Sequence, residues 1–389
     1  MSRFLLALAL FATTAFAHAA EPRARDLGVP FDGKPGPLNA ITDVAGVTVG
    51  QVTLIEDLAN GHKVRTGVTA ILPRGRDTYD TPVFAGWFAL NGNGEMTGTA
   101  WLDEGGDLEG PVMLTNTHSV GVVRDATIAE RVKAGGADST GYWWSLPVVA
   151  ETWDGDLNDI NGFHVRPEHV ARALAEARGG PVAEGNVGGG TGMICHQFKC
   201  GIGTASRRIS ESGHDYTVGV LVQANYGIRD GMRIAGVPVG DYLRNDLVDT
   251  GRRPGSASEA SDTGSIIIVI ATDAPLLPHQ LKRIARRAGM GLARMGRYSG
   301  NGSGDIFIAF STANKDAMKD EGLQSAQFVG NDHIDPLFAA TAQATEEAIV
   351  NAMVAAKDMQ GDGGHYAKAI PHAELVTVLK KFNRYQPRK

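Results

Sequence analysis

The sequence changes abruptly from a polar segment to an apolar one at a single peptide bond, Gly264-Ser265. The segment before it, GRRPGSASEASDT (251–263), is rich in Gly, Ser and Pro and has few large apolar side chains, as linkers do. The residues that follow, SIIIVIAT, form a short apolar run rich in β-branched side chains, which is typical of a buried strand. A linker therefore meets a core strand at this bond, and Ser265 is the first residue of that strand.

Strands and helices are expected on both sides of the linker. Short apolar runs separated by glycine predict strands in VAGVTVGQVTLI, GVTAILPRG, VFAGWFALNG, PVMLTNTHSVGVV and, after the linker, DIFIAFSTA. Helical spacing predicts helices in PEHVARALAEARGG, PLLPHQLKRIARRAGMGLARMG and DPLFAATAQATEEAIVNAMVAAKDM. This alternation favours an α/β or α+β layered sandwich over two unrelated domains.

The first residues predict export from the cytoplasm. Residues 1–19 contain one arginine, an apolar run and Ala17-His18-Ala19, the pattern of a cleavable signal peptide. The apolar run is too short for a membrane anchor, so we expect a mature periplasmic or secreted protein that begins near Ala20. The formal net charge of -6 and the lack of a basic cluster argue against nucleic acid or a membrane as partner.

Two cysteines and a glycine cluster are structural features rather than recognised sites. Cys195 and Cys200 could pair in an oxidising compartment, or could be two small side chains at the ends of a strand or turn. A zinc site would need further ligands besides these and His196, so we expect no metal. GNVGGGTGM (185–193) lacks the spacing of a phosphate-binding loop and predicts a tight turn.

Ser265 has a chemical use if the bond before it is cut. Cleavage would make Ser265 a new N-terminus, with a hydroxyl nucleophile and an α-amino group on the same residue. An α-amine has a pKa of about 8 and is suited to accept the hydroxyl proton near neutral pH. Gly264 has no Cβ and tolerates the backbone geometry that attack on its carbonyl requires.

The sequence around this bond resembles the self-processing L-aminopeptidase/D-Ala-esterase/amidase family, which includes the β-peptidyl aminopeptidases. Blocks in the order of that family cover nearly all of the mature chain: NAITDVAGVTVGQVT, RTGVTAILPRG, LTNTHSVGVVRDA, ETWDGDLNDING, GGGTGM, VLVQANYG, GSIIIVIATDAPL, GSGDIFIAFSTAN and NAMVAAKDMQGDGGHYAKAIPH. The resemblance implies an α+β fold, a four-layered α-β-β-α sandwich like that of N-terminal nucleophile hydrolases but with different connectivity. It also implies self-cleavage into an α chain (20–264) and a β chain (265–389) of one catalytic domain, assembled as a tetramer of αβ units.

The resemblance also implies which residues form the site. Ser265 matches the nucleophile, and Ser303 and Asp305 match positions that assist it, Asp305 being one methylene shorter than the Glu of some β-peptidyl enzymes. Asn225 matches the amide donor of the oxyanion hole, and Glu151 matches the carboxylate that pairs with the free amine of the substrate.

Trp153 departs from the family pattern, because some members carry a tyrosine at this position whose hydroxyl contributes a second oxyanion donor. We expect Asn116 and His118, in TNTHS, to be wall or support residues.

The function expected is that of a cofactor-independent serine aminopeptidase. Its substrates would be small peptides, amides or esters, cleaved through an acyl-enzyme. The alternatives are a D-amino-acid amidase or esterase, a β-peptidyl aminopeptidase, an acyltransferase, and a binding protein that retains the fold. The base could be the Ser265 α-amine or the Ser303/Asp305 pair.

Overall fold

A computed structural model of the chain describes residues 22–135, 144–244, 264–296, 298–317 and 322–387. The expected signal peptide (1–19) and the linker (251–263) lie outside the described residues. Within these ranges, no helix combines the length and the apolar character that crossing a membrane requires.

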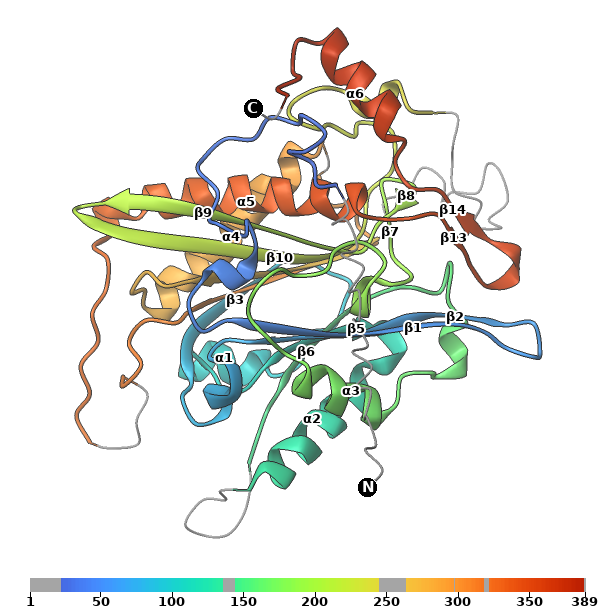
Figure 1. Cartoon of the computed structure of the whole chain (residues 1–389). Coiled ribbons are helices and arrows are strands. Elements are labelled where there is room, and N and C mark those ends of the chain that lie inside the picture. The colour runs from blue at the N-terminus through green and yellow to red at the C-terminus, as the bar shows by residue number, and fades with distance from the viewer. Residues whose placement is uncertain (1–21, 136–143, 245–263, 297, 318–321, 388–389) are drawn as a thin grey trace, which may run out of the picture.

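Two sheets form the centre of the molecule (Figure 1). The smaller has the order β1 (Thr48–Asp57), β2 (Lys63–Leu72), β5 (Val112–Asn116) and β6 (Val148–Thr152). The larger has the order β4 (Asp107–Leu108), β3 (Val83–Gly92), β12 (Gly304–Ser311), β11 (Ser265–Thr272), β10 (His214–Asn225) and β9 (Ile202–Glu211). Strands from both sides of the linker therefore share one sheet.

Helices cover the outer faces of both sheets. In Figure 1, α4 (Pro278–Arg294) and α5 (Asp335–Val354) lie on the larger sheet, and α2 (Val120–Ala134) and α3 (Pro167–Ala175) lie below the smaller one. The remaining elements are α1 (Thr99–Gly105), α6 (His372–Lys381), the strand pairs β7 (Ile194–Cys195) with β8 (Phe198–Lys199) and β13 (Met359–Gln360) with β14 (Tyr366–Ala367), and the 3-10 helices η1 (Ile41–Asp43), η2 (Gly75–Tyr79), η3 (Thr117–Ser119), η4 (Ile160–Gly162), η5 (Gly188–Gly190), η6 (Val239–Asp241), η7 (Asn331–His333) and η8 (Asp362–Gly364). The expected four-layered α+β sandwich is confirmed.

Strand β11 shows why an uninterrupted apolar run is needed at this place. All eight of its residues are buried. Because side chains alternate between the faces of a strand, Ile266, Ile268 and Ile270 join the apolar cluster under α4 and α5. Ile267 and Val269 join the cluster between the two sheets. A strand with apolar layers on both sides needs apolar residues at every position.

The expected helix after this strand is confirmed. The residues at helical spacing on α4, from Leu281 to Leu292, are buried in the cluster that this helix shares with α5 and the larger sheet. The glycine cluster is confirmed as a tight turn. A Cβ on Gly190 would lie 2.4 Å from the backbone nitrogen of Ile202, so no larger residue fits there.

The strand expected in PVMLTNTHSVGVV is only half right. It ends at Asn116, whose side-chain oxygen accepts a hydrogen bond from the backbone N–H of Ser119 at 3.0 Å. This Asn side chain caps the following turn, and helix α2 starts at Val120. The valines around Gly121 favour a strand and Gly121 disfavours a helix, but burial of Val123 and Ala126 against the smaller sheet outweighs these preferences. Helices α1 and α6 were also not expected.

Candidate active site

Ser265 lies at the amino end of β11, between two neighbouring strands. Its Cα is paired with Asn225 on antiparallel β10 and with Gly304 on parallel β12. The backbone N–H of Gly304 faces two oxygens, Ser265 Oγ and the carbonyl oxygen of Gly264, each at 3.3 Å. In the uncut chain, the hydroxyl of Ser265 and the preceding carbonyl thus share one donor, and Ser265 is 6% exposed.

Gly264 is pressed against the backbone of β10. A Cβ at this position would lie 2.2 Å from the carbonyl oxygen of Asn225 and 2.4 Å from Cα of Tyr226. Both neighbours are backbone atoms that cannot move aside independently. Glycine is therefore required by space before Ser265.

Ser303 and Asp305 form a buried pair at the start of β12. The hydroxyl of Ser303 donates to Asp305 Oδ1 at 2.8 Å, and both residues are 1% exposed. Asn93 holds the segment from the other side, because its backbone N–H donates to the carbonyl of Ser303 at 3.3 Å and its side chain donates to the carbonyl of Gly302 at 2.8 Å. The structure thus brings this pair next to Gly304, the strand neighbour of Ser265.

Asn225 has its side-chain amide oriented by one backbone contact. Its Oδ1 accepts a hydrogen bond from the N–H of Ile194 at 2.8 Å. A backbone N–H can only donate, so the oxygen must face Ile194 and Nδ2 must face away. Among the described residues this nitrogen has no hydrogen-bond acceptor, and Asn225 is 7% exposed. The amide can therefore donate to a further group beside Ser265.

Glu151 approaches from the other sheet, on β6. Its Oε1 accepts from the backbone N–H of Glu95 at 2.9 Å, and its Oε2 accepts from the hydroxyl of Thr117. Burial raises the pKa of the Glu151 carboxyl, against these two hydrogen bonds, which lower it.

Gly94 connects Glu151 to the Ser265 region. A Cβ on Gly94 would lie 3.3 Å from Glu151 Oε1 and 3.4 Å from Cα of Gly304. The carboxylate oxygen and Gly304 therefore lie no farther apart than the sum of these two distances. Glu151 from the smaller sheet and the strand neighbour of Ser265 from the larger sheet are thus brought close together at Gly94.

Trp153 is part of an exposed group of rings next to Glu151. Trp153 and Phe163 are 38% and 56% exposed. Both contact the ring of His118, with centroid distances of 5.7 Å and 5.8 Å. His118 follows Thr117, the donor to Glu151, so the rings stand beside the carboxylate as an apolar wall. Asn116 lies deeper and donates to the hydroxyl of Thr66 at 2.7 Å, as a support residue does.

Sequence reasoning missed two groups of this region, Thr117 and Asp154. Thr117 lies in the quoted TNTHS block, but only the meeting of β5 and β6 places it on Glu151. Asp154 is fully buried, and that burial raises its pKa to about 7, against hydrogen bonds from Thr66, Asn158 and Asn116. Nothing in ETWDG distinguishes this aspartate from a surface turn residue.

The raised pKa of Asp154 makes stability depend on pH. An unfolded aspartate loses its proton near pH 3.8, whereas the folded one keeps it until about pH 7, so folded-state stability falls as pH rises through this window. Asp154→Asn does not titrate. We measure the free energy of unfolding in urea at each pH. Between pH 5 and pH 8, we expect the value for the variant to rise by about 3 kcal/mol relative to that of wild type. Parallel pH profiles for the two proteins would contradict the assignment.

The two cysteines are joined as a disulfide, Cys195–Cys200, which settles the alternative left open by the sequence. Both sulfurs are therefore engaged with each other and not available as thiolate ligands.

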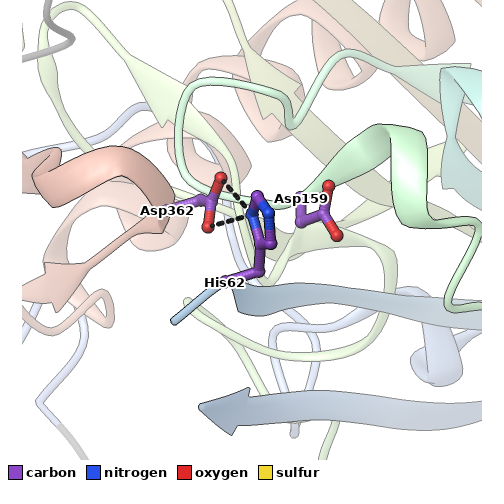
Figure 2. Close-up of side chains that lie close together, drawn as sticks. All are labelled: His62, Asp159 and Asp362. Carbon is purple, nitrogen blue, oxygen red and sulfur yellow. Dashed lines mark hydrogen bonds and ion pairs between the residues drawn. The ribbon is translucent and has the colours of Figure 1, made fainter. Parts of the chain in front are cut away.

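A group that could hold a metal ion lies elsewhere, at His62, Asp159 and Asp362, whose potential ligand atoms all lie within 4.8 Å of one another. Figure 2 shows the imidazole between the two carboxylates. His62 Nδ1 lies 3.1 Å and 3.2 Å from the two oxygens of Asp362, and this hydrogen bond raises the pKa of His62. The side chain of His62 is 51% exposed. We therefore interpret the contact between His62 and Asp362 as an ion pair at the surface.

Comparison with known proteins identifies relatives over most of the chain. Residues 39–367 match the model of peptidase family S58. Beta-peptidyl aminopeptidase BapA of Sphingosinicella microcystinivorans is 56% identical over 380 residues, covering 95% of this chain and 94% of that protein. The protein of the same name from Sphingosinicella xenopeptidilytica is 46% identical over 390 residues, covering 97% and 95%.

Solved structures agree with these sequence relatives. The Burkholderia sp. beta-aminopeptidase superposes with a TM-score of 0.83 at 50% identity, covering 92% of this chain and 99% of that one. The L-aminopeptidase D-Ala-esterase/amidase of Ochrobactrum anthropi, described as a variant of the Ntn hydrolase fold, gives a TM-score of 0.86 at 48% identity, covering 94% and 100%.

Proposed function

Because the chain belongs to peptidase family S58 and is an aminopeptidase, we propose that it is a self-cleaving serine aminopeptidase with Ser265 as nucleophile. The observation that carries the proposal is the position of Ser265. It follows a glycine that no other residue can replace, and its hydroxyl and the Gly264 carbonyl share the N–H of Gly304. No cofactor is required by this chemistry.

Self-cleavage uses this arrangement directly. Ser265 Oγ attacks the carbonyl carbon of Gly264, while the N–H of Gly304 stabilises the negative charge that develops on the carbonyl oxygen. The bond from that carbon to the nitrogen of Ser265 then breaks, and the nitrogen takes up the proton that the Ser265 hydroxyl lost on attack. Water hydrolyses the resulting ester, which leaves a carboxylate on Gly264 and a free α-amine on Ser265.

Turnover repeats the same chemistry on a substrate. Ser265 Oγ attacks the carbonyl, and its proton passes to the new α-amine or to the Ser303 hydroxyl, which Asp305 orients. Nδ2 of Asn225 donates to the oxyanion. The leaving amine or alcohol takes the proton, and water then releases the acyl group from Ser265.

Glu151 would select substrates with a free amino terminus. A buried carboxylate is stabilised by a cation, and the α- or β-ammonium group of a substrate supplies one. The half-buried ring of His118 and the exposed rings of Trp153 and Phe163 would contact the side chain or the extended backbone of that first residue.

Among possible substrates we favour short peptides, including β-peptides, because two relatives bear the name beta-peptidyl aminopeptidase. The alternative is the esterase and amidase activity on D-alanine derivatives that names the Ochrobactrum anthropi enzyme. Hydrolysis of β-homoalanine and D-alanine p-nitroanilides, compared at equal enzyme concentration, separates the two.

The precursor is further proposed to be exported after removal of residues 1–19 and to assemble, once cut, as a tetramer of αβ units. Residues 20–264 and 265–389 would be the two chains of one catalytic domain.

The test of the function is intact-mass analysis of the purified, active protein. We expect two chains, and terminal sequencing of the smaller one should read Ser-Ile-Ile-Ile, the start of residues 265–389. An active preparation that contains one uncut chain would refute the mechanism. If the chain cleaves itself but hydrolyses no substrate with a free amine, self-cleavage is supported and the aminopeptidase reaction is refuted.

A further inference from the structure

We infer that Lys199 and the Cys195–Cys200 disulfide are positioning residues for the reaction, because together they fix the peptide unit that orients the side-chain amide of Asn225. The inference rests on the proposed function, in which Asn225 donates to the oxyanion. It concerns the hairpin of β7 and β8, for which the reaction described above has no role.

The hairpin is held in a conformation that needs outside support. Its turn residues, His196 and Gln197, have φ of 49° and 57°, the left-handed region that costs a non-glycine residue roughly 1 kcal/mol or more. The disulfide joins the two arms on either side of this turn. Arg229, a buried side chain from beyond the hairpin, binds the turn, and its Nε donates to the carbonyl of His196 at 2.9 Å.

Lys199 supports the hairpin from inside. Its side chain is fully buried, and Nζ donates to the carbonyl of Met193 at 2.8 Å and to that of Cys200 at 2.6 Å. An amine is seldom buried without such partners, because it gives up hydration that only hydrogen bonds replace. Burial also lowers the pKa of Lys199 well below its usual range.

One peptide unit connects Lys199 to Asn225. The carbonyl of Met193 and the N–H of Ile194 belong to the same planar unit. The carbonyl accepts from Lys199 Nζ and, at 3.0 Å, from the backbone N–H of Cys200, and the N–H donates to Asn225 Oδ1 at 2.8 Å. If this plane turns, these contacts are lost together, and Nδ2 of Asn225 is no longer directed to the place beside Ser265. Without the Ile194 contact, the amide can flip.

The consequence is a loss of catalysis without loss of substrate binding. Removing an oxyanion donor lowers kcat by about 10² to 10³. A donor that is present but points in the wrong direction should lower kcat by a smaller factor. In processed enzyme we expect the double variant Cys195→Ala/Cys200→Ala, and separately Lys199→Met, to lower kcat about tenfold. KM should stay within about twofold of wild type, because Glu151 is untouched.

A double-mutant cycle tests the route through Asn225. Asn225→Ala has no amide to misdirect, so adding Lys199→Met or the paired Cys variant to it should cause no further fall in kcat. If these changes lower kcat equally in the wild-type and Asn225→Ala backgrounds, the inference is wrong. A normal kcat in Asn225→Ala itself would instead refute the proposed oxyanion role and leave Ser265 as the nucleophile.

Two controls separate positioning from lost stability or lost maturation. Val378→Ala, in α6, opens a small cavity in the apolar cluster that continues from the residues under α4 and α5, and it should leave kcat unchanged at temperatures where it is folded. Where a variant does not mature, processed wild type is reduced until mass analysis shows two thiols. The same fall in kcat, reversed on reoxidation, supports the inference, and unchanged kcat in the reduced enzyme overturns it.

Discussion

Ser265→Ala should yield a full-length, folded and inactive protein. The substitution removes the hydroxyl that attacks Gly264 and the hydroxyl that attacks substrate, so one change stops both self-cleavage and turnover. The cost in folding should be small, because alanine fills most of the same space at the start of β11. Intact mass should show one chain, and p-nitroanilide hydrolysis should fall to background, a loss of at least about 10⁴-fold on the scale of removed nucleophiles.

Two further variants show whether this loss belongs to the hydroxyl. Ser265→Cys keeps a nucleophile in place and should cleave itself more slowly than wild type. Gly264→Ala keeps Ser265 but introduces the Cβ that contacts Asn225 and Tyr226, and it should disturb the junction. Normal hydrolysis by Ser265→Ala would mean that another residue is the nucleophile.

The strand around Ser265 could be predicted from sequence because its causes are local. A buried strand with apolar layers on both faces requires an uninterrupted apolar run, and Ile266 to Ile270 supply it. The close approach of Gly264 to β10 could not be predicted in this way, because it depends on the pairing of β11 with β10. Helix α2 likewise could not be predicted from local preference, because Val120 and Val122 favour a strand and only packing against the smaller sheet decides that segment.

The composition of the site could not be derived from local pattern. Glu151 comes from the smaller sheet and Ser265 from the larger. Gly94 lies between Glu151 and Gly304, the strand neighbour of Ser265, and its small size lets the two sheets bring these residues close together. The resemblance to a family indicated Glu151, Asn225, Ser303 and Asp305, whereas no motif indicated Thr117 or Lys199. Thr117 acts through a contact with Glu151, which is far away in the sequence, and Lys199 acts through the backbone carbonyl of Met193. Contacts of these two kinds produce no characteristic spacing of residues in the sequence.

Glu151→Gln should abolish most of the preference for a free amino terminus. In processed enzyme, kcat/KM for an aminoacyl p-nitroanilide should fall by about 10² to 10⁴, because breaking a buried ion pair costs about 3–5 kcal/mol. The N-acetylated substrate carries no charge and should be affected far less, so the ratio between the two substrates should narrow. Glutamine can still accept from Glu95 N–H and donate to the Thr117 hydroxyl, so the side chain should keep its place.

The pH profile tests the same residue through its protonation. Burial raises the pKa of Glu151 in the free enzyme above that of an exposed glutamate. As the pH is lowered, the carboxylate therefore takes up its proton earlier than an exposed glutamate would. The value of kcat/KM for the free amine should decline in this pH range. Glu151→Gln should lose this acidic limb. The matched control is Glu95→Gln, at a neighbouring exposed carboxylate whose backbone N–H donates to Glu151 and whose charge helps to raise the pKa of Glu151. This variant should retain the limb, displaced to lower pH. Equal wild-type rates on free and acetylated substrates would show instead that the enzyme is a general amidase.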